Sequence, residues 1–534
     1  MRSVSTLLRL CRIALALAFA ALATPGHRCS ASGAEAPTQV QIESGRVQGR
    51  AADGVIAFKG IPFAEPPIGA LRWRPPQPAT PWSNVLEASE FSSDCAQPPS
   101  KRSKGADSED CLYINVWRPA VAEGKPLPVM VWIYGGALTV GGASLYPGDG
   151  LAAQGIVYVS FNYRLGRFGF FAHPALASED HNAPRGNYGY MDQVAALKWV
   201  KHNIAAFGGD PNNVTIAGES AGGGSVLALL SSPMARGLFQ RAILQSPGLP
   251  TPRAGALPMR SLVDAEKIAV DYARSLGVDD TGPRALTKLR ALPTAKLYEG
   301  LEDRQEWLLA AFGDAEVPGM SFAIVDGRLV PAPPEVTIRA GRQAPVPVIV
   351  GANDADLAVS AVKTPQELFA LFGPLASQAR TLYDPNGDAS LQELIQNVIA
   401  DRSMVEPSRN LAELTARAGE PAYFYRFSYV PEVGRATESG APHGSEIPFA
   451  FDRVAAVLKD QATARDLAMA KTISGYWVDF VKTGNPNRGE RPEWQPYDPT
   501  TGDVLNFTNT GVKFGPDPLK ARLDLWRSVW EKRR

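Results

Sequence analysis

Short apolar runs recur along the chain, and they lack the strict alternation of half-exposed strands. Strands of a parallel sheet that are covered on both faces have this pattern. We therefore expect buried strands at these segments: Val129–Tyr134, Val157–Phe161, Val214–Ala217, Ala242–Gln245 and Val346–Val350, with one more strand at Ala422–Ser428.

Helical patterns lie between and beyond these runs. Apolar residues spaced by three and four positions predict a helix over Tyr190–Phe207, and further helices are expected at Gly223–Leu230 and Thr463–Lys482. Strands that alternate with helices indicate an α/β fold with a mostly parallel central sheet and helices on both faces. The Pro- and Gly-rich stretch Pro250–Pro345 is expected to add helices over the edge of the sheet that carries the candidate site.

The overall charge of the chain argues against one class of partner, nucleic acids. The 534 residues include 54 basic and 54 acidic side chains, so the formal net charge is +0. Nucleic-acid-binding proteins usually carry a basic excess, so we expect no nucleic-acid partner. Because neither an internal repeat nor a long low-complexity linker interrupts the chain, we expect one large domain over residues 35–534.

The first 34 residues read as a signal peptide, with a cleavage site somewhere between residues 23 and 36. Arg2, Arg9 and Arg12 supply positive charge, and Ile13–Ala23 is an unbroken apolar run. This run is too short to cross a bilayer, which takes about 20 residues. We expect the mature protein to be soluble and exported, either secreted or periplasmic, without a stable membrane span.

The cysteine positions fit an oxidising compartment. Cys95 and Cys111 close a short loop in the mature chain and are candidates for a disulfide, which is worth about 3 kcal/mol in the chain-entropy model. Cys11 lies in the leader, and the fate of Cys29 depends on where the leader is cut.

The pentapeptide Gly218-Glu219-Ser220-Ala221-Gly222 follows a predicted strand and opens a predicted helix. A sharp strand-to-helix turn needs small residues because the backbone approaches its neighbours closely. Such a turn exposes the serine hydroxyl at the end of the sheet and at a helix N-terminus. The pattern Gly-x-Ser-x-Gly is weak alone, but here its position makes Ser220 a candidate nucleophile.

A serine hydroxyl needs a general base, and five histidines are available. His27 falls in or beside the leader, His173 and His181 lie in a polar loop well before the turn, and His202 belongs to the solvated face of a helix. His443 remains, in a loop far downstream of the serine, as the order Ser…acid…His requires.

The third member of such a triad is a carboxylate that follows a strand between Ser220 and His443. The strand Val346–Val350 is followed by both Asp354 and Asp356, and position alone does not separate them.

Backbone N–H groups must also stabilise the negative charge that develops on the substrate oxygen. The Gly-rich turn that follows the strand Val129–Ile133 supplies them. Gly136 and Ala137 are the candidate donors there, joined by Ala221 after the nucleophile.

With these motifs, the chain resembles the type-B carboxylesterase/lipase family of the α/β-hydrolase fold. This family includes carboxylesterases and cholinesterases. The resemblance spans Gln39 to Trp530. The segments that carry it are Phe207–Gly222 (FGGDPNNVTIAGESAG), Glu109–Pro119 (EDCLYINVWRP), Asn162–Gly166 (NYRLG) and Lys59–Ala64 (KGIPFA).

The resemblance implies Ser220 as nucleophile, His443 as base and a Cys95–Cys111 disulfide. The family pattern Gly-x-Asn-x-x-Glu-Gly places Asp356 on the glutamate and Leu357 on the last glycine. The triad is thus expected to be Ser–His–Asp, with the loop moved inward to compensate for the shorter acid.

The resemblance also bears on residues around the triad. Ala137 stands where the family commonly has a third glycine, a change that keeps the backbone donor. Glu219, Ser246 and Glu446 match a buried polar network behind the histidine, with a catalytic or a purely structural role.

The choice of ester is only partly restricted. Cholinesterases carry an aromatic platform for a quaternary ammonium in the first disulfide loop. Here that loop, Ala96–Asp110, has no aromatic residue and contains Lys101, Arg102 and Lys104. A choline ester is therefore not expected, and the basic residues either attract an anionic substrate or form a solvated loop tip.

Together these features predict a serine hydrolase that cleaves small-molecule carboxylic esters through an acyl-enzyme, with no metal or organic cofactor. The same machinery serves amides, carbamates and thioesters, so those acyl bonds stay open. A non-catalytic adhesion protein of the neuroligin type is disfavoured because Ser220 and His443 are both present. The oligomeric state stays open.

Overall fold

A computed structural model describes residues 36–99, 107–121, 124–179, 184–248, 259–301, 308–309 and 318–532. The expected leader lies outside these ranges. An 11-stranded sheet runs through the described chain in the order β16-β15-β14-β13-β10-β9-β7-β8-β6-β4-β3. Strands β8, β7, β9, β10, β13, β14 and β15 are mutually parallel, and the strands at both ends of the sheet are antiparallel to their neighbours. The α/β class with a mostly parallel sheet is confirmed.

The strands of this sheet have the following bounds: β3 Arg50–Ala52, β4 Val55–Pro62, β6 Tyr113–Pro119, β7 Leu127–Ile133, β8 Val157–Phe161, β9 Gly209–Glu219, β10 Arg241–Gln245, β13 Val348–Asn353, β14 Ala422–Ser428, β15 Asp503–Thr508 and β16 Gly511–Pro516. Smaller sheets contain β1 Gln39–Ile42, β2 Gly45–Gln48 and β5 Val85–Glu87, and β11 Arg260–Ser261 with β12 Ile324–Val325.

The expected strands are all present in this sheet, but several boundaries differ. Strand β7 covers Leu127–Ile133 rather than Val129–Tyr134, and β9 covers Gly209–Glu219 rather than Val214–Ala217. Strand β13 begins at Val348 rather than at Val346 and extends to Asn353. Pro345 and Pro347 lack the backbone N–H that a strand ladder needs, so the ladder starts after them. The shift matters because it brings Asn353, at the end of β13, into the buried interior.

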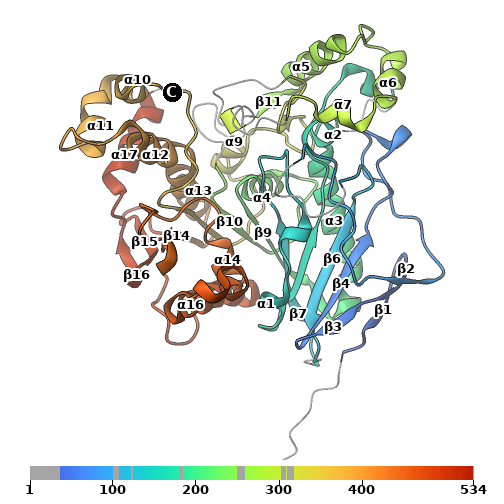
Figure 1. The fold of residues 1–534 in the computed structure, drawn as a ribbon, viewed down its shortest axis with the longest axis horizontal. Coiled ribbons are helices and arrows are strands. Elements are labelled where there is room, and N and C mark those ends of the chain that lie inside the picture. Colours follow the sequence, from blue (N-terminus) through green and yellow to red (C-terminus); the bar gives the residue numbers. More distant parts are fainter. Residues whose placement is uncertain are drawn as a thin grey trace, which may run out of the picture.

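Helices flank the sheet on both sides and form separate groups around it (Figure 1). They are α1 Asp149–Ala152, α2 Gly166–Gly169, α3 Tyr188–Asn203, α4 Ala221–Ser231, α5 Leu262–Ser275, α6 Pro283–Arg290, α7 Thr294–Tyr298, α9 Pro334–Arg339, α10 Pro365–Ala370, α11 Ala376–Tyr383, α12 Leu391–Ala400, α13 Glu406–Arg417, α14 Ile447–Ala450, α15 Val454–Leu458, α16 Ala464–Thr483 and α17 Lys520–Lys532. Among the described residues, no helix combines the length and apolar character needed to cross a bilayer.

The described parts of residues 250–345 form a helical layer against the end of the sheet (Figure 1). The buried Arg72 donates to the carbonyl of Leu292 at 2.8 Å and so ties this layer to the sheet domain. The sulfur of Met320 lies 3.7 Å from Thr139 Oγ1, in the turn after β7. The expected packing of this stretch over the edge that carries the candidate site agrees with these contacts.

The registers of the central strands bring their carboxyl ends to one edge. Ile133 of β7 pairs with Gly218 of β9, Glu219 of β9 pairs with Gln245 of β10, and Gln245 pairs with Gly351 of β13. The turns that follow these strands therefore lie side by side. In open α/β sheets this edge is the usual place for a binding site.

Candidate functional site

The turn between β9 and α4 holds Ser220 in an unusual backbone conformation. Its φ and ψ are 58° and −127°, a region that residues with a side chain rarely occupy. The glycines on either side are needed for space, since a Cβ on Gly222 would collide with the carbonyl of Ile133 and a Cβ on Gly218 would collide with Gly222. The strained turn places Ser220 at the N-terminus of α4, as the sequence predicts.

His443 and Asp356 meet across the same edge of the sheet. His443 Nδ1 lies 2.5 Å from Asp356 Oδ1, although the residues are separated by 87 positions. Their loops are held together by the pairing of Ala355 with Pro442 and by the bond from Asn353 Nδ2 to the carbonyl of Pro442 at 2.6 Å. The contact is therefore built into the backbone arrangement of both loops.

Asp356 is 1% exposed and is surrounded by donors. Ser246 Oγ and the Asn353 amide donate to its Oδ2 at 2.6 and 2.9 Å, and the Leu357 amide donates to its Oδ1 at 2.7 Å. Burial alone raises the pKa of Asp356, but the charge of His443 and these hydrogen bonds outweigh it and lower the pKa below its usual value. The carboxylate is thus ionised at neutral pH.

Asp354, the alternative acid, points elsewhere. Its Oδ1 accepts the Ala441 amide at 2.7 Å, and burial raises its pKa. Asp354 therefore braces the loop that carries His443, whereas Asp356 is the carboxylate that contacts the imidazole.

The other imidazole nitrogen faces Glu219, with 3.1 Å between His443 Nε2 and Glu219 Oε1. Burial lowers the pKa of His443, but the carboxylates of Glu219 and Asp356 raise it to about 9 overall. A favourable Nε2–Oε1 contact needs a proton between the two atoms, which fits an imidazolium. No hydrogen bond joins Ser220 Oγ to His443 in the part of the chain that the structure describes.

Further polar residues form hydrogen bonds behind His443 and Asp356. Glu446 accepts from Asn353 Nδ2 at 2.7 Å and from Gln245 Nε2 at 3.0 Å, and burial raises the pKa of Glu446. Gln245 in turn accepts from Trp477 Nε1 at 3.0 Å. Asn353, Gln245 and Trp477 were not predicted from the sequence to belong to the site. The signal for the first two was available, because each is a polar residue at the carboxyl end of an apolar strand.

The turn after β7 is built from residues with positive φ values. Gly136 has φ 113°, and Ala137 and Leu138 have φ values of 54° and 60°. The Thr139 and Val140 amides close the turn on the carbonyl of Gly136 at 3.0 and 3.1 Å.

The amides of Gly136, Ala137 and Ala221 donate to no residue that the structure describes. A Cβ on Gly135 would lie 2.9 Å from Ser220 Cβ, so this turn and the serine turn are in contact. The arrangement can present free N–H groups beside the serine hydroxyl.

The Cys95–Cys111 disulfide is present, with 4.9 Å between the two Cα atoms. Its loop starts next to the turn after β7. Lys101, Arg102 and Lys104, the basic residues of this loop, lie outside the described residues.

The other histidines are placed as follows. His202 has a side chain that is 58% exposed, which confirms the expected solvated face. His173 is fully buried, and its Nδ1 accepts the Ala175 amide at 3.2 Å. His173 lies in a loop as expected, but the position is buried rather than polar, because the ring caps a helical turn and stacks on Phe171. His27 and His181 lie outside the described residues. Within the described residues, no group of three or more His, Cys, Asp or Glu side chains is placed so that it could hold a metal ion.

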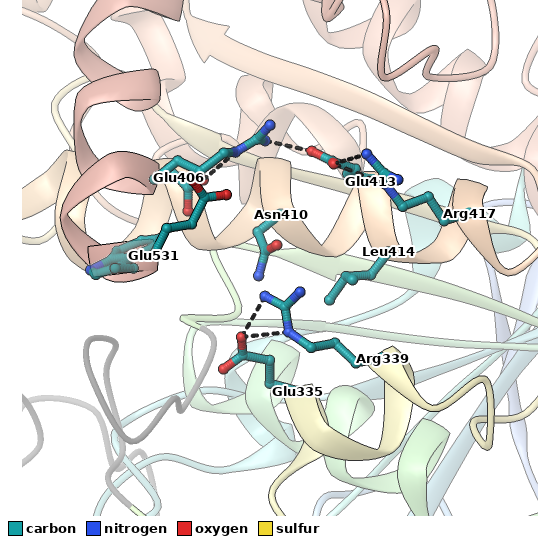
Figure 2. Close-up of a pocket in the computed structure, with 10 residues that line it drawn as sticks. Glu335, Arg339, Glu406, Asn410, Glu413, Leu414, Arg417 and Glu531 are labelled. Atoms are coloured by element: carbon teal, nitrogen blue, oxygen red, sulfur yellow. Dashed lines mark hydrogen bonds and ion pairs between the residues drawn. The ribbon is translucent and has the colours of Figure 1, made fainter. Parts of the chain in front are cut away.

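A second charged cluster shares no residue with this site. It surrounds a cavity of about 280 Å³ lined by α9, α13 and α17, and Figure 2 shows the Glu335–Arg339 pair facing Asn410 and Glu413 across it. Glu406 also lines the cavity and is 1% exposed.

Comparisons with known proteins agree on one family. The model of the carboxylesterase family matches residues 36–371 and 374–526. Fumonisin B1 esterase of Sphingopyxis macrogoltabida is 36% identical over 502 residues, which cover 90% of this chain and 88% of the relative. Para-nitrobenzyl esterase of Bacillus subtilis is 34% identical over 488 residues, or 87% and 94% of the two chains. A solved structure of PNB esterase matches with a TM-score of 0.76 and 34% identity, covering 92% of this chain and 99% of that one.

Proposed function

The chain belongs to the carboxylesterase family and hydrolyses carboxylic esters, and we propose that Ser220, His443 and Asp356 carry out this reaction. The observation that best supports the assignment is the buried contact of 2.5 Å between Asp356 and His443 at the strand edge that also carries Ser220. A Ser–His–Asp set of this kind is recognised by geometry and roles, not by position in the sequence.

The reaction proceeds in two steps. Ser220 Oγ attacks the ester carbonyl carbon while His443 Nε2 takes its proton. The tetrahedral intermediate collapses, the bond to the alcohol oxygen breaks, and His443 returns the proton to the leaving alcohol. His443 then takes a proton from water, which attacks the acyl carbon. The bond between that carbon and Ser220 Oγ breaks, His443 returns the proton to Oγ, and the acid is released.

Asp356 orients the imidazole and stabilises its protonated form during both steps. The amides of Gly136, Ala137 and Ala221 stabilise the oxyanion. Their lack of other acceptors among the described residues supports this role, since groups that already donate to the protein would be less available to the intermediate.

His443 must lose its contact with Glu219 before it can act as a base. With Asp356 at Nδ1, the neutral imidazole carries its proton there and offers Nε2 to the serine. Glu219 favours the protonated imidazole instead, so we assign it to the control of the pH at which the base becomes available. Ser246 and Glu446 support Asp356 and the strand ends.

The test is hydrolysis of p-nitrophenyl acetate, butyrate and octanoate by the purified protein and by Ser220→Ala. We expect turnover by the wild type and a loss of at least about 1,000-fold in kcat for the variant. Equal rates for the two proteins would reject Ser220 as the nucleophile. The rates for the three chain lengths measure the reach of the acyl pocket, and matched amide and thioester substrates test the other acyl bonds.

We infer that the single catalytic domain begins after a leader of about 34 residues and that the mature chain is exported. The support is the Cys95–Cys111 disulfide, which persists in oxidising compartments, together with the basic and apolar pattern of the first residues. N-terminal sequencing of the protein recovered from its native host is the test, and an intact Met1 would reject the leader.

A further inference from the structure

We infer that Gln97 is a positioning residue for the oxyanion turn, a role that rests on the proposed function of Gly136 and Ala137. Gln97 lies in the disulfide loop, far from the serine in sequence, and is 2% exposed. Its side-chain amide pairs with one residue of the turn after β7. It accepts the Gly141 amide on Oε1 at 2.8 Å and donates from Nε2 to the Gly141 carbonyl at 2.9 Å.

The anchor point of Gln97 is itself fixed. Its Nε2 also donates to the carbonyl of Cys95 at 3.0 Å, and Cys95 is tied to Cys111 by the disulfide. The Ala96 amide donates to the carbonyl of Ser108 at 2.9 Å, which closes the base of the loop. The Gln97 amide group is therefore held by covalent and hydrogen-bonded restraints that do not involve the oxyanion turn.

The turn needs an external restraint because it is strained. Ala137 and Leu138 both adopt left-handed backbone conformations, with φ 54° and 60°. Each such residue costs about 1–2 kcal/mol relative to the right-handed region. Within the turn the strain is opposed by the two bonds that the Thr139 and Val140 amides donate to the carbonyl of Gly136.

Gly141 is the point at which a restraint acts on the whole turn. It has φ 120°, and a Cβ there would lie 2.9 Å from the carbonyl oxygen of Gly135. The start and the end of the turn are thus in contact. Gln97 fixes both polar backbone groups of Gly141, so it sets the orientation of the peptide planes between Gly135 and Gly141, including the amides proposed to bind the oxyanion.

This role predicts a specific kinetic pattern. The turn contacts the substrate oxygen most strongly in the transition state, so its displacement lowers kcat more than it changes KM. A shift of about 1 Å in such a group is worth about 100-fold in rate. We therefore expect Gln97→Met and Gln97→Glu to lower kcat by about 10- to 100-fold and to leave KM within about three-fold of the wild type.

The experiment compares these variants with Gln154→Met, whose native side chain donates to the backbone carbonyl of Gly150 at 3.0 Å on α1. Rates are divided by the concentration of sites titrated with a fluorophosphonate, so unfolded protein is not counted. In parallel, inhibition is measured with an aryl trifluoromethyl ketone, which adds to the serine and places an oxyanion in the hole. We expect the inhibition constant to rise by the same factor as kcat/KM falls in the Gln97 variants, with no change in Gln154→Met.

Wild-type kcat and wild-type inhibition by the ketone in either Gln97 variant would overturn the inference. A lower melting temperature with unchanged kinetics per titrated site would reduce Gln97 to a structural residue and would also overturn it. Failure of the proposed function has a different signature, namely no inhibition of the wild type by the ketone and full activity in Ser220→Ala.

Discussion

Asp356 and Glu406 are two carboxyl groups with equal burial and opposite pKa shifts. Each is 1% exposed. The pKa of Asp356 is lowered, whereas burial raises the pKa of Glu406 to about 8 against the opposing charges of Arg409 and Arg527. Burial therefore does not determine the charge state of a carboxyl group in this protein.

The difference lies in hydrogen bonding. Both oxygens of Asp356 accept short hydrogen bonds from groups fixed at the strand ends. Glu406 Oε2 has no hydrogen-bond partner in the described chain, and its Oε1 lies 3.5 Å from Arg409 and 3.8 Å from Arg527. Both arginines make closer contacts with other acids, namely Asp524 and Glu413. Figure 2 shows Glu413 between two charged partners, Arg417 and Arg527, and Arg527 also contacts Glu406.

The two regions differ in the charge that their buried carboxyl group carries at neutral pH. The cluster around Asp356 holds a negative charge at neutral pH beside the imidazole of His443, as the proposed role of His443 as a general base requires. The cluster around Glu406 keeps a proton near neutral pH and contributes to packing among α13 and α17. Direct hydrogen bonds stabilise the buried charge of Asp356, whereas arginines 3.5 and 3.8 Å away do not do so for Glu406.

The largest effect is expected from Asp356→Asn. The amide cannot stabilise the imidazolium and favours the wrong tautomer, so kcat should fall by about 10,000-fold with the fold intact. Steady-state hydrolysis of p-nitrophenyl butyrate measures this loss. Asp354→Asn is the matched control, because Asp354 contacts the Ala441 amide rather than the imidazole. A greater loss in Asp354→Asn than in Asp356→Asn would reverse the assignment of the acid.

Glu406→Gln tests whether the pKa of the buried Glu406 is raised. Because the folded pKa of Glu406 lies above its unfolded value of about 4.5, the stability from this group is present below that value and is lost as pH rises through about 8. The glutamine does not ionise. Between pH 5 and pH 9 the wild type should lose about 4 kcal/mol more stability than the variant.

Thermal or denaturant unfolding at both pH values measures this difference. Parallel pH profiles of stability for the two proteins would show that Glu406 does not have a raised pKa. Esterase activity is the internal control, since Glu406 lies in neither the proposed triad nor the proposed oxyanion turn.

Ser246→Ala removes one of the donors that make Asp356 different from Glu406. The bond from Ser246 Oγ to Asp356 Oδ2 is 2.6 Å long and goes to a charged acceptor, so its loss should reduce stability by about 2 kcal/mol at pH 7. Since the folded pKa of Asp356 lies below its unfolded value, this loss should shrink as pH falls and the carboxylate becomes protonated. A loss that is independent of pH would assign the effect to packing alone.

Glu219→Gln is expected to change the pH profile rather than the maximum rate. The carboxylate of Glu219 raises the pKa of His443, and only the neutral imidazole accepts a proton from the serine. The acid limb of kcat/KM should therefore move to lower pH in the variant. Glu446→Gln is the comparison, with a smaller move in the same direction. An acid limb of kcat/KM that is unchanged in Glu219→Gln would show that Glu219 does not raise the pKa of His443.

The fold and the serine turn were predictable from sequence because they depend on local patterns. Continuous apolar runs mark the strands, and the glycines around Ser220 are required by contacts within a few residues of the turn. The strand at Val346 was misplaced by two residues because prolines interrupt the ladder in a run that is otherwise apolar.

Contacts between residues far apart in the sequence were harder to predict. Asp354 and Asp356 are equivalent by their position after the strand. The family resemblance favoured Asp356, and the packing of the Ala355 and Pro442 segments shows that Asp356 meets His443. The contact of His443 with Glu219 likewise depends on how the loop approaches the serine turn, which no local pattern records.

The most direct test of the central assignment is reaction of the protein with a fluorophosphonate, followed by peptide mass spectrometry and a parallel activity assay. Our account predicts one phosphonyl group per chain, located on Ser220, with hydrolysis lost in proportion to its incorporation. Modification of another residue, or full esterase activity after Ser220 is modified, would contradict it.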